Sequence, residues 1–499
     1  MRKLFILGIY FLVFSCTHPD PVEKESAETG KPNIVLIVAD DHGMNDLGCY
    51  GNQAISTPNL DYLASEGLRF TRAYSTAPSC TASRSVILTG LYNHLNGLYG
   101  HEHSYHHFRA HDYLKSLPVY LSELGGYETL RIGKYHVAPE SVFKFDRVLK
   151  ANGRNPVAMA DTVGNYLKSK RPQPFFLYYC TQDPHRGGGK VASNSYKPDR
   201  FGNKDEGYPG VEPLAVSPEE TLVPEFLPEL PETRAELEQY YQSVNRVDQG
   251  VGRLIARLKQ NQLWDNSIIV YISDNGIAFP GAKTNIYEPG IRLPCLVKNT
   301  GSYRKGTVVD ALINWADHTP TLLDMAGILP RAREQLTLSF ADVPLNNQNL
   351  KTRLKDFHGS SFKPLLMGEE TTGSAETYAS HTFHEITMYY PMRSVITKDY
   401  KLIWNIAHQL PYPHASDLWE SATWQGALKT ASQQYGLRAI HDYTFRPEFE
   451  LYDLSNDPHE TTNLAENYQH AEIFNTLKEK LKSFQEKTND PWISKWKHE

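Results

Sequence analysis

Three short runs of consecutive apolar residues mark the chain at positions 33–39 (NIVLIVA), 174–180 (PFFLYYC) and 267–273 (SIIVYIS). Their side chains do not alternate between apolar and polar, which is typical of strands that are covered on both faces of a parallel sheet. Apolar residues with helical spacing lie between these runs, over 57–67 and 232–260. Strands that alternate with helices predict an α/β fold in which helices flank a large, mostly parallel sheet.

The pattern changes in the last quarter of the chain, beyond an irregular stretch at 329–373. Residues 378–405 and 450–454 have the composition of short strands joined by turns, and 471–487 has the spacing of an amphipathic helix. We therefore predict a second, smaller α+β domain with an antiparallel sheet. The predicted domain ranges are 32–372 for the first domain and 373–499 for the second.

The N-terminus has the pattern of a processing signal. Arg2 and Lys3 precede an apolar stretch at 4–14 that is too short to span a bilayer as a mature helix. The stretch ends in Val-Phe-Ser-Cys, which resembles the lipobox of bacterial lipoproteins, so Cys16 is predicted to carry lipid. The alternative is an ordinary cleaved signal with an incidental cysteine. The lipobox predicts an exported bacterial lipoprotein, periplasmic or anchored at the outer membrane, with a signal peptide at 1–16 and a flexible tether at 17–31.

The composition and the net charge of the chain indicate which kinds of molecule it is expected to bind. The chain has 499 residues, 40% hydrophobic and 22% charged, and a formal net charge of −6, as expected for a globular enzyme. It contains no run of Lys and Arg that would follow a phosphate backbone, so we expect no nucleic-acid partner and membrane contact only through the lipid anchor. Five cysteines are too few for a disulfide scaffold, although one bridge among those beyond Cys16 stays open.

Acidic side chains follow two of the predicted strands. Asp40 and Asp41 come directly after the first apolar run, and Asp274 and Asn275 directly after the third. In open α/β sheets, ligands bind beyond the carboxyl ends of the strands, so these four residues are expected at one edge. Either pair alone is explained by turn or helix-cap chemistry. Both pairs together predict a hard cation, Ca²⁺ or Mg²⁺, because carboxylate and amide oxygens are its preferred ligands.

A cysteine stands at the start of another predicted helix. Residues 79–84 read Ser-Cys-Thr-Ala-Ser-Arg and lead into the helical pattern at 85–91. A cysteine at a helix start with Arg84 four positions on lies in an electropositive place that favours an anionic ligand. For an isolated cysteine, a buried structural thiol would be the better interpretation.

The segment from Cys80 to Arg84, followed by Leu-Thr-Gly at 88–90, resembles the nucleophile motif of the sulfatase family. Membership implies an alkaline-phosphatase-like sandwich fold and oxidation of Cys80 to formylglycine by a sulfatase-maturating enzyme. Ala82 stands where many members have Pro, which fits a radical-type bacterial maturation enzyme.

From 32 to 492 the chain resembles one subgroup of the family, the sulfamidases, which hydrolyse N-sulfoglucosamine. This resemblance implies removal of N-sulfate from terminal glucosamine in heparin or heparan sulfate fragments. Lys283 stands where the subgroup typically has Arg, which bears on the substrate, and His42 stands where Gly is expected. The matching stretches are 133–137, 183–186, 246–252, 273–277, 384–388, 390–394, 450–453 and 457–461.

The resemblance also implies a ligand set and catalytic roles. One Ca²⁺ ion would neutralise the sulfate and favour ionisation of the formylglycine hydrate. Arg84 would hold the hydrate, while Lys134 and Lys283 would bind sulfate oxygens. The implied calcium ligands are Asp40, Asp41, Asp274, Asn275 and the formylglycine derived from Cys80.

Two proton transfers need their own side chains. The departing amine requires a general acid, for which His185 is the candidate and Lys134 and Lys283 are alternatives. Expulsion of sulfate requires a base near the remaining hydroxyl, a role that fits His136. Sugar recognition is assigned by subgroup resemblance to His384, Glu385 and Arg393.

A further group of histidines, 101, 103, 106 and 107, could suggest Zn²⁺. Because the sulfamidase pattern also has histidines here, we interpret them as lining the pocket entrance. The Asp-His pair at 317–318 is interpreted as structural.

Three alternatives remain for the function. The first is an exo-O-sulfatase acting on a related glycosaminoglycan sugar. The second is a phosphatase or phosphodiesterase of the alkaline phosphatase group, but the second zinc ligand set of such enzymes is not apparent. The third is a lipid-anchored glycan-binding protein without catalysis, which predicts an unmodified Cys80. The leading hypothesis has a sulfated glucosamine saccharide and a maturation enzyme as partners, with a homodimer suggested by the subgroup.

Overall fold

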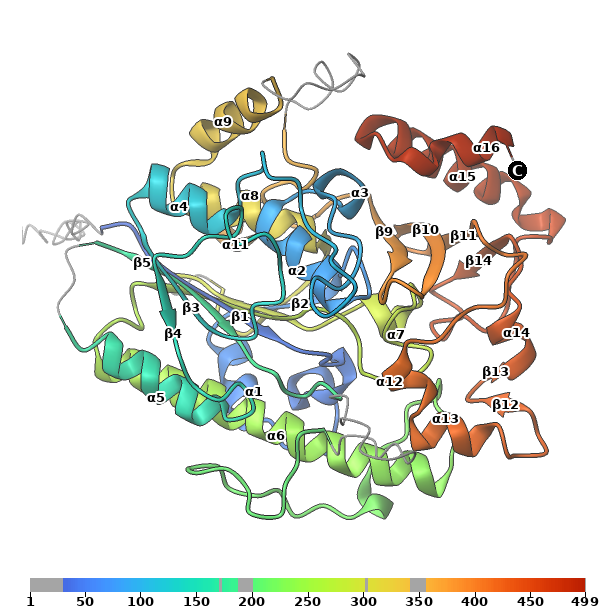
Figure 1. Ribbon diagram of the computed structural model, residues 1–499, viewed down its shortest axis with the longest axis horizontal. Helices are drawn as coiled ribbons and strands as arrows, with labels where there is room; N and C mark the ends of the chain where they lie inside the picture. Colours follow the sequence, from blue (N-terminus) through green and yellow to red (C-terminus); the bar gives the residue numbers. More distant parts are fainter. Residues whose placement is uncertain (1–29, 170–172, 187–200, 301–303, 342–355, 499) are drawn as a thin grey trace, which may run out of the picture. The chain divides into compact units, whose positions relative to one another are not determined.

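An eight-stranded sheet forms the centre of the protein in this computed structural model, which describes residues 30–169, 173–186, 201–300, 304–341 and 356–498 (Figure 1). The strand order is β4-β3-β5-β1-β6-β7-β2-β8, and β7 alone among the eight is antiparallel to its neighbours. The predicted large, mostly parallel sheet is therefore confirmed. Its strands are β1 (Asn33–Ala39), β2 (Leu68–Tyr74), β3 (Glu128–Gly133), β4 (Arg147–Leu149), β5 (Phe175–Cys180), β6 (Ser267–Ser273), β7 (Cys295–Lys298) and β8 (Thr307–Asn314).

Helices cover both faces of this sheet, as the continuous apolar runs predict. Every residue of β1 is buried. Its even-numbered side chains pack with α2 (Cys80–Thr89), α4 (Leu117–Gly125) and α8 (His318–Met325). Its odd-numbered ones pack with α1 (Pro58–Ser65), α5 (Pro156–Tyr166) and α6 (Pro231–Gln260). Because burial of one large aliphatic side chain contributes roughly 1.5–3 kcal/mol, a strand of this composition is strongly held at the centre of the sheet.

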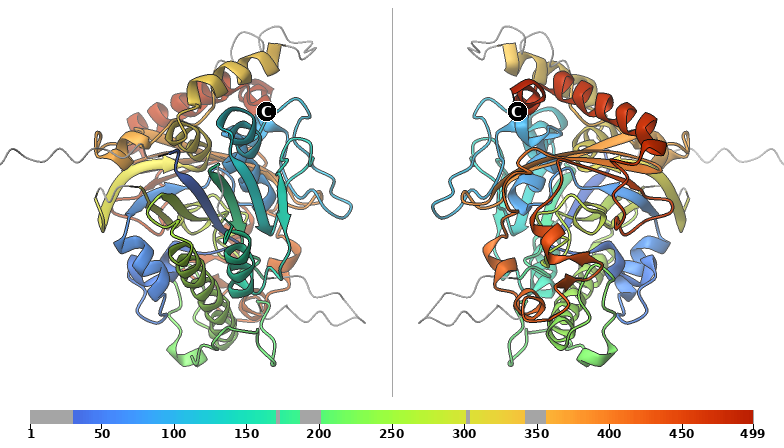
Figure 2. Two further views of the ribbon diagram at one scale, coloured as in Figure 1. Left: turned by 90° about the vertical axis from the view of Figure 1, so that its left-hand side faces the viewer. Right: turned by 90° about the vertical axis from the view of Figure 1, so that its right-hand side faces the viewer.

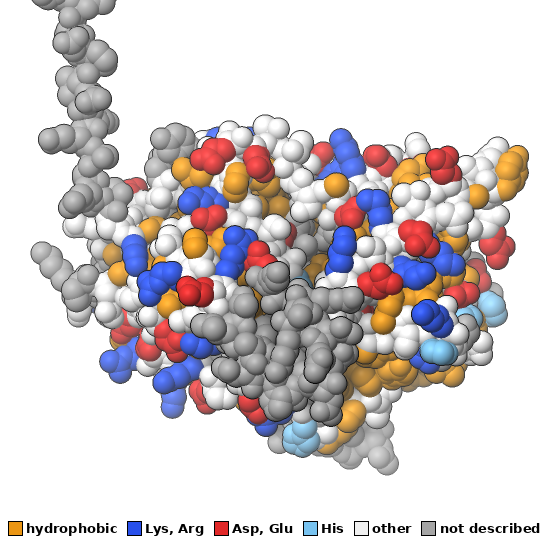
Figure 3. Space-filling view, turned by 90° about the horizontal axis from the view of Figure 1, so that it is seen from above, with side chains coloured by type: hydrophobic (Ala, Val, Ile, Leu, Met, Phe, Trp, Pro, Cys, Tyr) orange, Lys and Arg blue, Asp and Glu red, His pale blue; other side chains and the backbone are white. Residues whose placement is uncertain are grey.

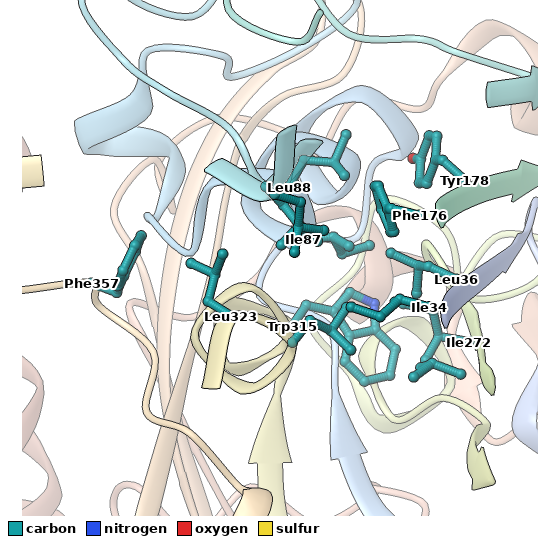
Figure 4. Packing of buried hydrophobic residues seen from close by; sticks show 14 of the residues in the cluster. Ile34, Leu36, Ile87, Leu88, Phe176, Tyr178, Ile272, Trp315, Leu323 and Phe357 are labelled. Atoms are coloured by element: carbon teal, nitrogen blue, oxygen red, sulfur yellow. The ribbon is translucent and has the colours of Figure 1, made fainter. Parts of the chain in front are cut away.

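The core on the α2 side fixes where the first turn of that helix lies. Ile87 and Leu88 of α2 lie in one buried cluster with Ile34 and Leu36 of β1 and Ile272 of β6 (Figure 4). This packing anchors the C-terminal half of α2 on the two central strands. The N-terminal end of the helix is thereby placed at the carboxyl ends of those strands.

A second sheet is antiparallel, with the order β14-β11-β10-β9. Its strands are β9 (Glu376–Phe383), β10 (Tyr389–Thr397), β11 (Tyr400–Asn405) and β14 (Phe449–Asp453). One face is covered by α15 (Ala471–Thr488), drawn in red in Figure 2. Val395 and Leu402 of the sheet share a buried cluster with Leu477 and Leu481 of this helix. The other face contributes Met392 and Ile403 to a core shared with α6. The predicted C-terminal antiparallel sheet and final helix are thus confirmed.

Shorter elements complete the described chain. The stretch at 329–373, which we expected to be irregular, contains α9 (Leu329–Ala341) and α11 (Lys363–Met367), so that expectation is wrong at both places. α2 starts at Cys80, the residue predicted at a helix start, and its first turn precedes the helical pattern at 85–91. The remaining helices and strands are α3 (Asn93–Asn96), α7 (Glu288–Ile291), α12 (Ser416–Trp419), α13 (Ala422–Ala427), β12 (Gln434–Tyr435), β13 (Arg438–Ala439), α14 (Ile440–Thr444) and α16 (Lys495–His498).

Residues 31–499 form one compact unit that contains both sheets, and the domain boundary at 372 stays a prediction. The signal peptide, Cys16 and the tether up to 29 lie outside the described residues. Within the described part, no helix is long and apolar enough to cross a membrane. The four cysteines found there, Cys49, Cys80, Cys180 and Cys295, are not joined by disulfides.

Charges are mixed on the surface. On the face seen in Figure 3, Lys and Arg side chains are interspersed with Asp and Glu. With a formal net charge of −6, a sulfated ligand would have to be held by cations gathered at one place.

Candidate active site

The two acidic pairs lie side by side because their strands are neighbours. β1 and β6 run parallel in register, with Ala39 opposite Ser273, so Asp40 and Asp41 emerge next to Asp274 and Asn275. The Asp41 backbone N–H donates to Asp274 Oδ1 at 3.1 Å. Asp41 has a φ of 65°, a conformation that is uncommon for residues other than glycine. Asp41 therefore has a strained backbone, and it lies where the carboxylates that follow β1 and β6 meet. Strained residues of this kind are frequent at functional sites.

Cys80 completes the cluster from the first position of α2. Its Sγ lies 3.6 Å from Asp41 Oδ1 and the side chain is fully buried. One side-chain ligand atom from each of four residues falls within 4.8 Å of the others, namely Asp40, Asp41, Cys80 and Asp274. The packing of α2 on β1 and β6 therefore brings the predicted nucleophile onto the predicted metal ligands.

Three cations surround the carboxylates, and each has its shortest contact with a different one, while Arg84 also lies 3.7 Å from Asp40. Lys134, directly after β3, places Nζ 2.9 and 2.7 Å from the two oxygens of Asp40. Arg84 Nε lies 2.9 Å from Asp274 Oδ2. Lys283 Nζ lies 3.0 Å from Asp41 Oδ2. This gathers the local positive charge that an anionic sulfate group would need.

The protonation of the carboxylates is perturbed by their burial. Burial raises the pKa of Asp274 to about 7, against the effect of Arg84, and the nearby charges of Asp40 and Asp41 raise it further. Burial likewise raises the pKa of Asp41. For Asp40, the ion pairs with Lys134 and Arg84 outweigh burial and lower the pKa. Three adjacent carboxylates in a buried place are therefore incompletely compensated by the protein's own cations.

This donor set fits a hard cation. Asp40, Asp41 and Asp274 offer carboxylate oxygens, and the buried Oδ1 of Asn275 accepts no hydrogen bond from the residues that the structure describes. An amide oxygen without a hydrogen-bond donor, next to three close carboxylates, is a set of oxygen ligands that suits Ca²⁺ or Mg²⁺. The residues present would hold such an ion.

His185 lies at the more accessible side of the cluster. Its Nε2 is 3.8 Å from Asp41 Oδ2, and its side chain is 22% exposed, against 13% for Lys134 and 1% for Lys283. Arg154 donates to the His185 carbonyl at 2.7 Å, which fixes the backbone beneath the imidazole. Burial and the neighbouring Lys283 and Lys134 lower the pKa of His185 well below its usual value.

His136 stands next to the cluster and contacts the predicted histidine group. It has a φ of 54°, and its Nε2 lies 3.2 Å from His103 Nδ1. The His101 ring is 5.2 Å from the His136 ring and 4.1 Å from the ring of His384. His384 in turn places Nδ1 2.8 Å from Oγ of Ser79, the residue before the nucleophile. Two predicted site residues, His136 and His384, thus border the cluster.

The other two predicted sugar-binding residues have partners within the protein. Glu385 is half-buried and accepts a hydrogen bond from the Ser416 backbone N–H at 3.1 Å. Arg393 is buried, and its Nε and Nη2 donate to the two oxygens of Asp490 at 2.6 and 3.1 Å. A direct contact between Arg393 and a sugar would require this ion pair to open. Sugar recognition by these residues stays a prediction.

Sequence patterns gave no indication of Asp417. This residue of α12 places Oδ2 3.0 Å from Lys283 Nζ, so Lys283 lies between Asp41 and Asp417. Within the described part of the structure, Asp417 Oδ1 is buried and has no hydrogen-bond partner. A single aspartate in an irregular stretch carries no recognisable spacing, and only the folded chain brings it to the cluster.

The structure also gives an account of His42. The side chain is fully buried, and its Nδ1 lies 2.5 Å from the hydroxyl of Tyr271 on β6. Burial lowers the pKa of His42 to about 4, so the imidazole is neutral. It packs under the metal-ligand turn as a core residue.

Comparisons with known proteins place the chain in a family. The model of the sulfatase family matches residues 32–328, and the model of the N-sulphoglucosamine sulphohydrolase C-terminal region matches 424–487. The chain belongs to the sulfatase family and is a hydrolase of that class. It is 38% identical to the human N-sulphoglucosamine sulphohydrolase over 476 residues, which is 92% of this chain and 91% of the human one.

Two further proteins are similar to this chain, one in sequence and one in structure. An N-acetylglucosamine-6-O-sulfatase of Bacteroides thetaiotaomicron is 25% identical, over 96% of this chain and 90% of its own length. A solved structure described as a complex with its substrate, D-glucosamine-2-N,6-O-disulfate, has a TM-score of 0.63 at 22% identity and covers 92% of this chain and 98% of its own. This last likeness supports the fold.

Proposed function

We propose that the enzyme hydrolyses the N-sulfate of terminal N-sulfoglucosamine in heparin or heparan sulfate fragments, using a formylglycine made from Cys80 and one Ca²⁺ ion. The observation that carries the proposal is the position of Cys80, which is buried against Asp41 and lies within the electrostatic reach of Lys134 and Lys283. The choice of N-sulfate is supported by the 38% identity to the human enzyme and by the matching C-terminal region.

The state of Cys80 supports its conversion. Burial raises the pKa of the Cys80 thiol well above its usual value, although Lys134 and Lys283 lower it. A neutral thiol is a weak nucleophile, so the encoded cysteine is poorly suited to attack sulfur. A maturation enzyme that accepts two electrons and two protons from the Cβ–SH group would give a thioaldehyde, and water would replace its sulfur to leave an aldehyde and hydrogen sulfide. Addition of water to this aldehyde gives a hydrate with two hydroxyl groups.

The side chains around position 80 divide the remaining work. Bound calcium would supply positive charge that polarises the sulfate group. Lys134 and Lys283 bind sulfate oxygens, and their charges stabilise the negative charge that builds during attack by one hydrate oxygen. His185 donates a proton to the glucosamine nitrogen as the S–N bond breaks. His136 then takes a proton from the second hydroxyl, which restores the aldehyde and expels sulfate.

The protonation of His185 fits this role when substrate is present. In the free protein, burial and the two lysines keep its pKa low, so the imidazole is neutral near pH 7. A sulfate anion between His185 and the lysines would offset their positive charge and favour the imidazolium. The acid would then be formed where the anionic substrate is bound.

An exo-O-sulfatase is the second candidate. Lys283 at a position where sulfamidases typically have Arg favours it, as does the 25% identity to the N-acetylglucosamine-6-O-sulfatase. An alcohol or alkoxide leaving group would require the same metal and cations. The two candidates therefore differ in the substrate and not in the machinery.

The test is hydrolysis by matured, calcium-loaded enzyme of N-sulfoglucosamine, glucosamine 6-sulfate and N-acetylglucosamine 6-sulfate, with Cys80→Ala as the matched blank. Sulfate release from N-sulfoglucosamine with kcat/KM at least about tenfold above the O-sulfated sugars supports the proposal. Preference for an O-sulfated sugar would replace it by the second candidate. Activity equal to that of Cys80→Ala on all three sugars would reject both.

We also propose that the chain is exported and lipidated at Cys16, as its lipobox-like sequence suggests. Labelled fatty acid should enter the protein in a bacterial host, and Cys16→Ser should abolish the label. Labelling that persists in this variant would contradict the assignment. A homodimer is proposed from the subgroup resemblance alone, and light scattering of the purified protein at two concentrations would test it.

A further inference from the structure

Three side-chain atoms meet beside the calcium-type cluster. His136 Nε2 lies 3.2 Å from His103 Nδ1 and 3.2 Å from Glu102 Oε2. The third distance, from His103 Nδ1 to Glu102 Oε2, is 3.3 Å. Two imidazole nitrogens and one carboxylate oxygen therefore form a nearly equilateral triangle. If each imidazole donates its N–H to the Glu102 oxygen, two edges are explained, but the two nitrogens then face each other at 3.2 Å without a proton between them.

The triangle has the size of one face of a tetrahedral zinc site. Zn–N and Zn–O bonds of about 2.0–2.1 Å place the ligand atoms of a tetrahedron about 3.3–3.4 Å apart. A point about 2.05 Å from all three atoms lies roughly 0.8 Å above their plane, so an ion fits without movement of the backbone. The ligand atoms of His101, His103 and His136 also lie within 4.8 Å of one another, which offers His101 as a fourth partner.

The donor types differ from those of the calcium-type cluster. Asp40, Asp41 and Asp274 provide oxygen ligands, which suit a hard cation. Imidazole nitrogens with one carboxylate suit Zn²⁺ and similar transition metals. The His103 side chain is 53% exposed and that of Glu102 is 19% exposed, so an ion can reach the triangle from solvent. The two groups share no ligand.

We propose that Glu102, His103 and His136 form a second metal site, for a divalent transition-metal ion of the Zn²⁺ class. Because His136 contributes Nε2 to the site, an ion bound there holds the imidazole away from proton transfer at position 80. Occupation therefore inhibits hydrolysis; this second part rests on the proposed role of His136, whereas the metal site itself does not.

The binding test uses Co²⁺ as a spectroscopic probe on the full chain with Ca²⁺ in excess. One equivalent of Co²⁺ should give the intense visible absorption of tetrahedral nitrogen and oxygen coordination, and Zn²⁺ should displace it. His103→Ala and Glu102→Gln should each weaken Co²⁺ binding at least about 100-fold, since even outer partners of a metal site contribute about 10- to 100-fold.

His107→Asn is the matched control for binding. His107 is an exposed histidine of the same loop, and Asn tolerates its positive φ of 54°. This variant should bind Co²⁺ like the parent. Binding that is equal in the parent and in His103→Ala would overturn the site. Absence of tetrahedral Co²⁺ absorption, or a thiolate-to-cobalt band from Cys80, would overturn it as well.

The inhibition test measures sulfate release with and without Zn²⁺. Each protein is compared with itself with and without Zn²⁺, because loss of the His103 contact to His136 can change the activity in the absence of Zn²⁺. With Zn²⁺, the parent and His107→Asn should lose activity while His103→Ala resists. Zn²⁺ that binds at the triangle but leaves hydrolysis unchanged would overturn the inhibitory role. If the parent hydrolyses no sulfated sugar, the proposed function fails, and the Co²⁺ result still decides the metal site.

Discussion

Two groups of buried charges in the described part of this protein differ in how their charges are compensated. At the ends of β1 and β6, Asp40, Asp41 and Asp274 lie close together and the pKa of Asp274 rises to about 7 because the site is buried and the neighbouring carboxylates repel. In the C-terminal part, Arg393 and Asp490 form a single buried pair. There, Arg393 lowers the pKa of Asp490 well below its usual range, although burial alone would raise it.

The surroundings of the second pair explain the contrast. Asp490 accepts hydrogen bonds from Arg393, from the Gln485 amide at 3.0 Å and from the Trp492 backbone N–H at 3.1 Å. Arg393 also donates to the His381 and Met392 carbonyls at 3.2 and 2.9 Å. Around Asp41, by contrast, a strained backbone and the open Oδ1 of Asn275 remain, among the residues that the structure describes. The charges of Arg393 and Asp490 are compensated within the protein, whereas those of the carboxylates beyond β1 and β6 are not, which supports the proposal that an ion binds there.

The largest expected effect comes from Asp41→Asn. This change removes a predicted calcium ligand and the partner of Lys283, so we expect sulfatase activity to fall at least about 10³-fold. Stability measured in chelator should not fall, because the change removes repulsion between buried carboxylates. Activity assays and thermal unfolding with and without Ca²⁺ provide the measurements.

The matched control for Asp41→Asn is Asp46→Asn. Asp46 is a buried carboxylate that accepts a hydrogen bond from Tyr240 at 3.0 Å and lies outside the cluster. Its replacement should leave the calcium-dependent rise in melting temperature in place. If Asp41→Asn and Asp46→Asn lose the calcium-dependent rise in melting temperature equally, Asp41 does not differ from an ordinary buried carboxylate as a calcium ligand.

Asp490→Asn should produce the opposite result. It leaves the Arg393 guanidinium buried without its charge partner, so the free energy of unfolding should fall by about 3 kcal/mol. Sulfatase activity per folded molecule should stay near that of the parent. Denaturant unfolding measures the first and active-fraction titration the second.

An exposed pair offers the control for Asp490→Asn. Arg109 and Asp112 lie 2.6 Å apart with side chains 57% and 71% exposed, so Asp112→Asn should change stability by no more than about 0.5 kcal/mol. A specific loss of substrate affinity in folded Asp490→Asn protein would instead give Arg393 a direct role with the sugar.

The buried pair of Arg393 and Asp490 also predicts how the stability of the protein depends on pH. A folded-state pKa below the ordinary Asp value of about 3.9 means that Asp490 stabilises the fold above that pH. The stabilisation is lost as the pH falls below about 3.9 toward the lower pKa of the folded protein. The stability difference between the parent and Asp490→Asn should therefore shrink between pH 5 and the acid limit, as followed by denaturant unfolding across that range. If the stability difference between the parent and Asp490→Asn stays constant over this pH range, the pair of Arg393 and Asp490 does not cause the pH dependence.

The smallest expected effect is that of Asp417→Asn. Lys283 would keep Asp41 but lose its contact to Asp417, so the ammonium would be held less firmly where sulfate oxygens bind. We expect kcat/KM to fall about tenfold, which corresponds to roughly 1.4 kcal/mol. Asp442→Asn, at an exposed position of the same C-terminal part, serves as the control and should leave kcat/KM unchanged. If kcat/KM of Asp417→Asn equals that of the parent, the contact between Lys283 and Asp417 does not contribute to catalysis.

Sequence reasoning reached the parts of the site that depend on local pattern. The apolar runs at 33–39 and 267–273 predicted two buried strands, and their neighbouring positions in the sheet brought Asp40, Asp41, Asp274 and Asn275 together. The helix start at Cys80 followed from its motif, with the first turn beginning five residues earlier than the helical pattern suggested.

The parts that sequence reasoning missed depend on contacts between distant segments. Asp417 lies 134 positions from Lys283, and nothing in its own neighbourhood distinguishes it from a surface aspartate. Glu102 is placed against His136 by a loop whose path is set by packing and not by periodicity. α9 formed inside a stretch expected to be irregular, because burial of Ala332 and Leu336 against the core stabilises a helix that propensity alone leaves uncertain.

The central claim is that position 80 acts as formylglycine, and peptide mass spectrometry across this residue tests it most directly. Protein from a host with a suitable maturation enzyme should contain the aldehyde in place of the Cys80 thiol, in a fraction that matches the fraction of active enzyme. Protein that is fully active on N-sulfoglucosamine while Cys80 remains an unmodified thiol would contradict the account.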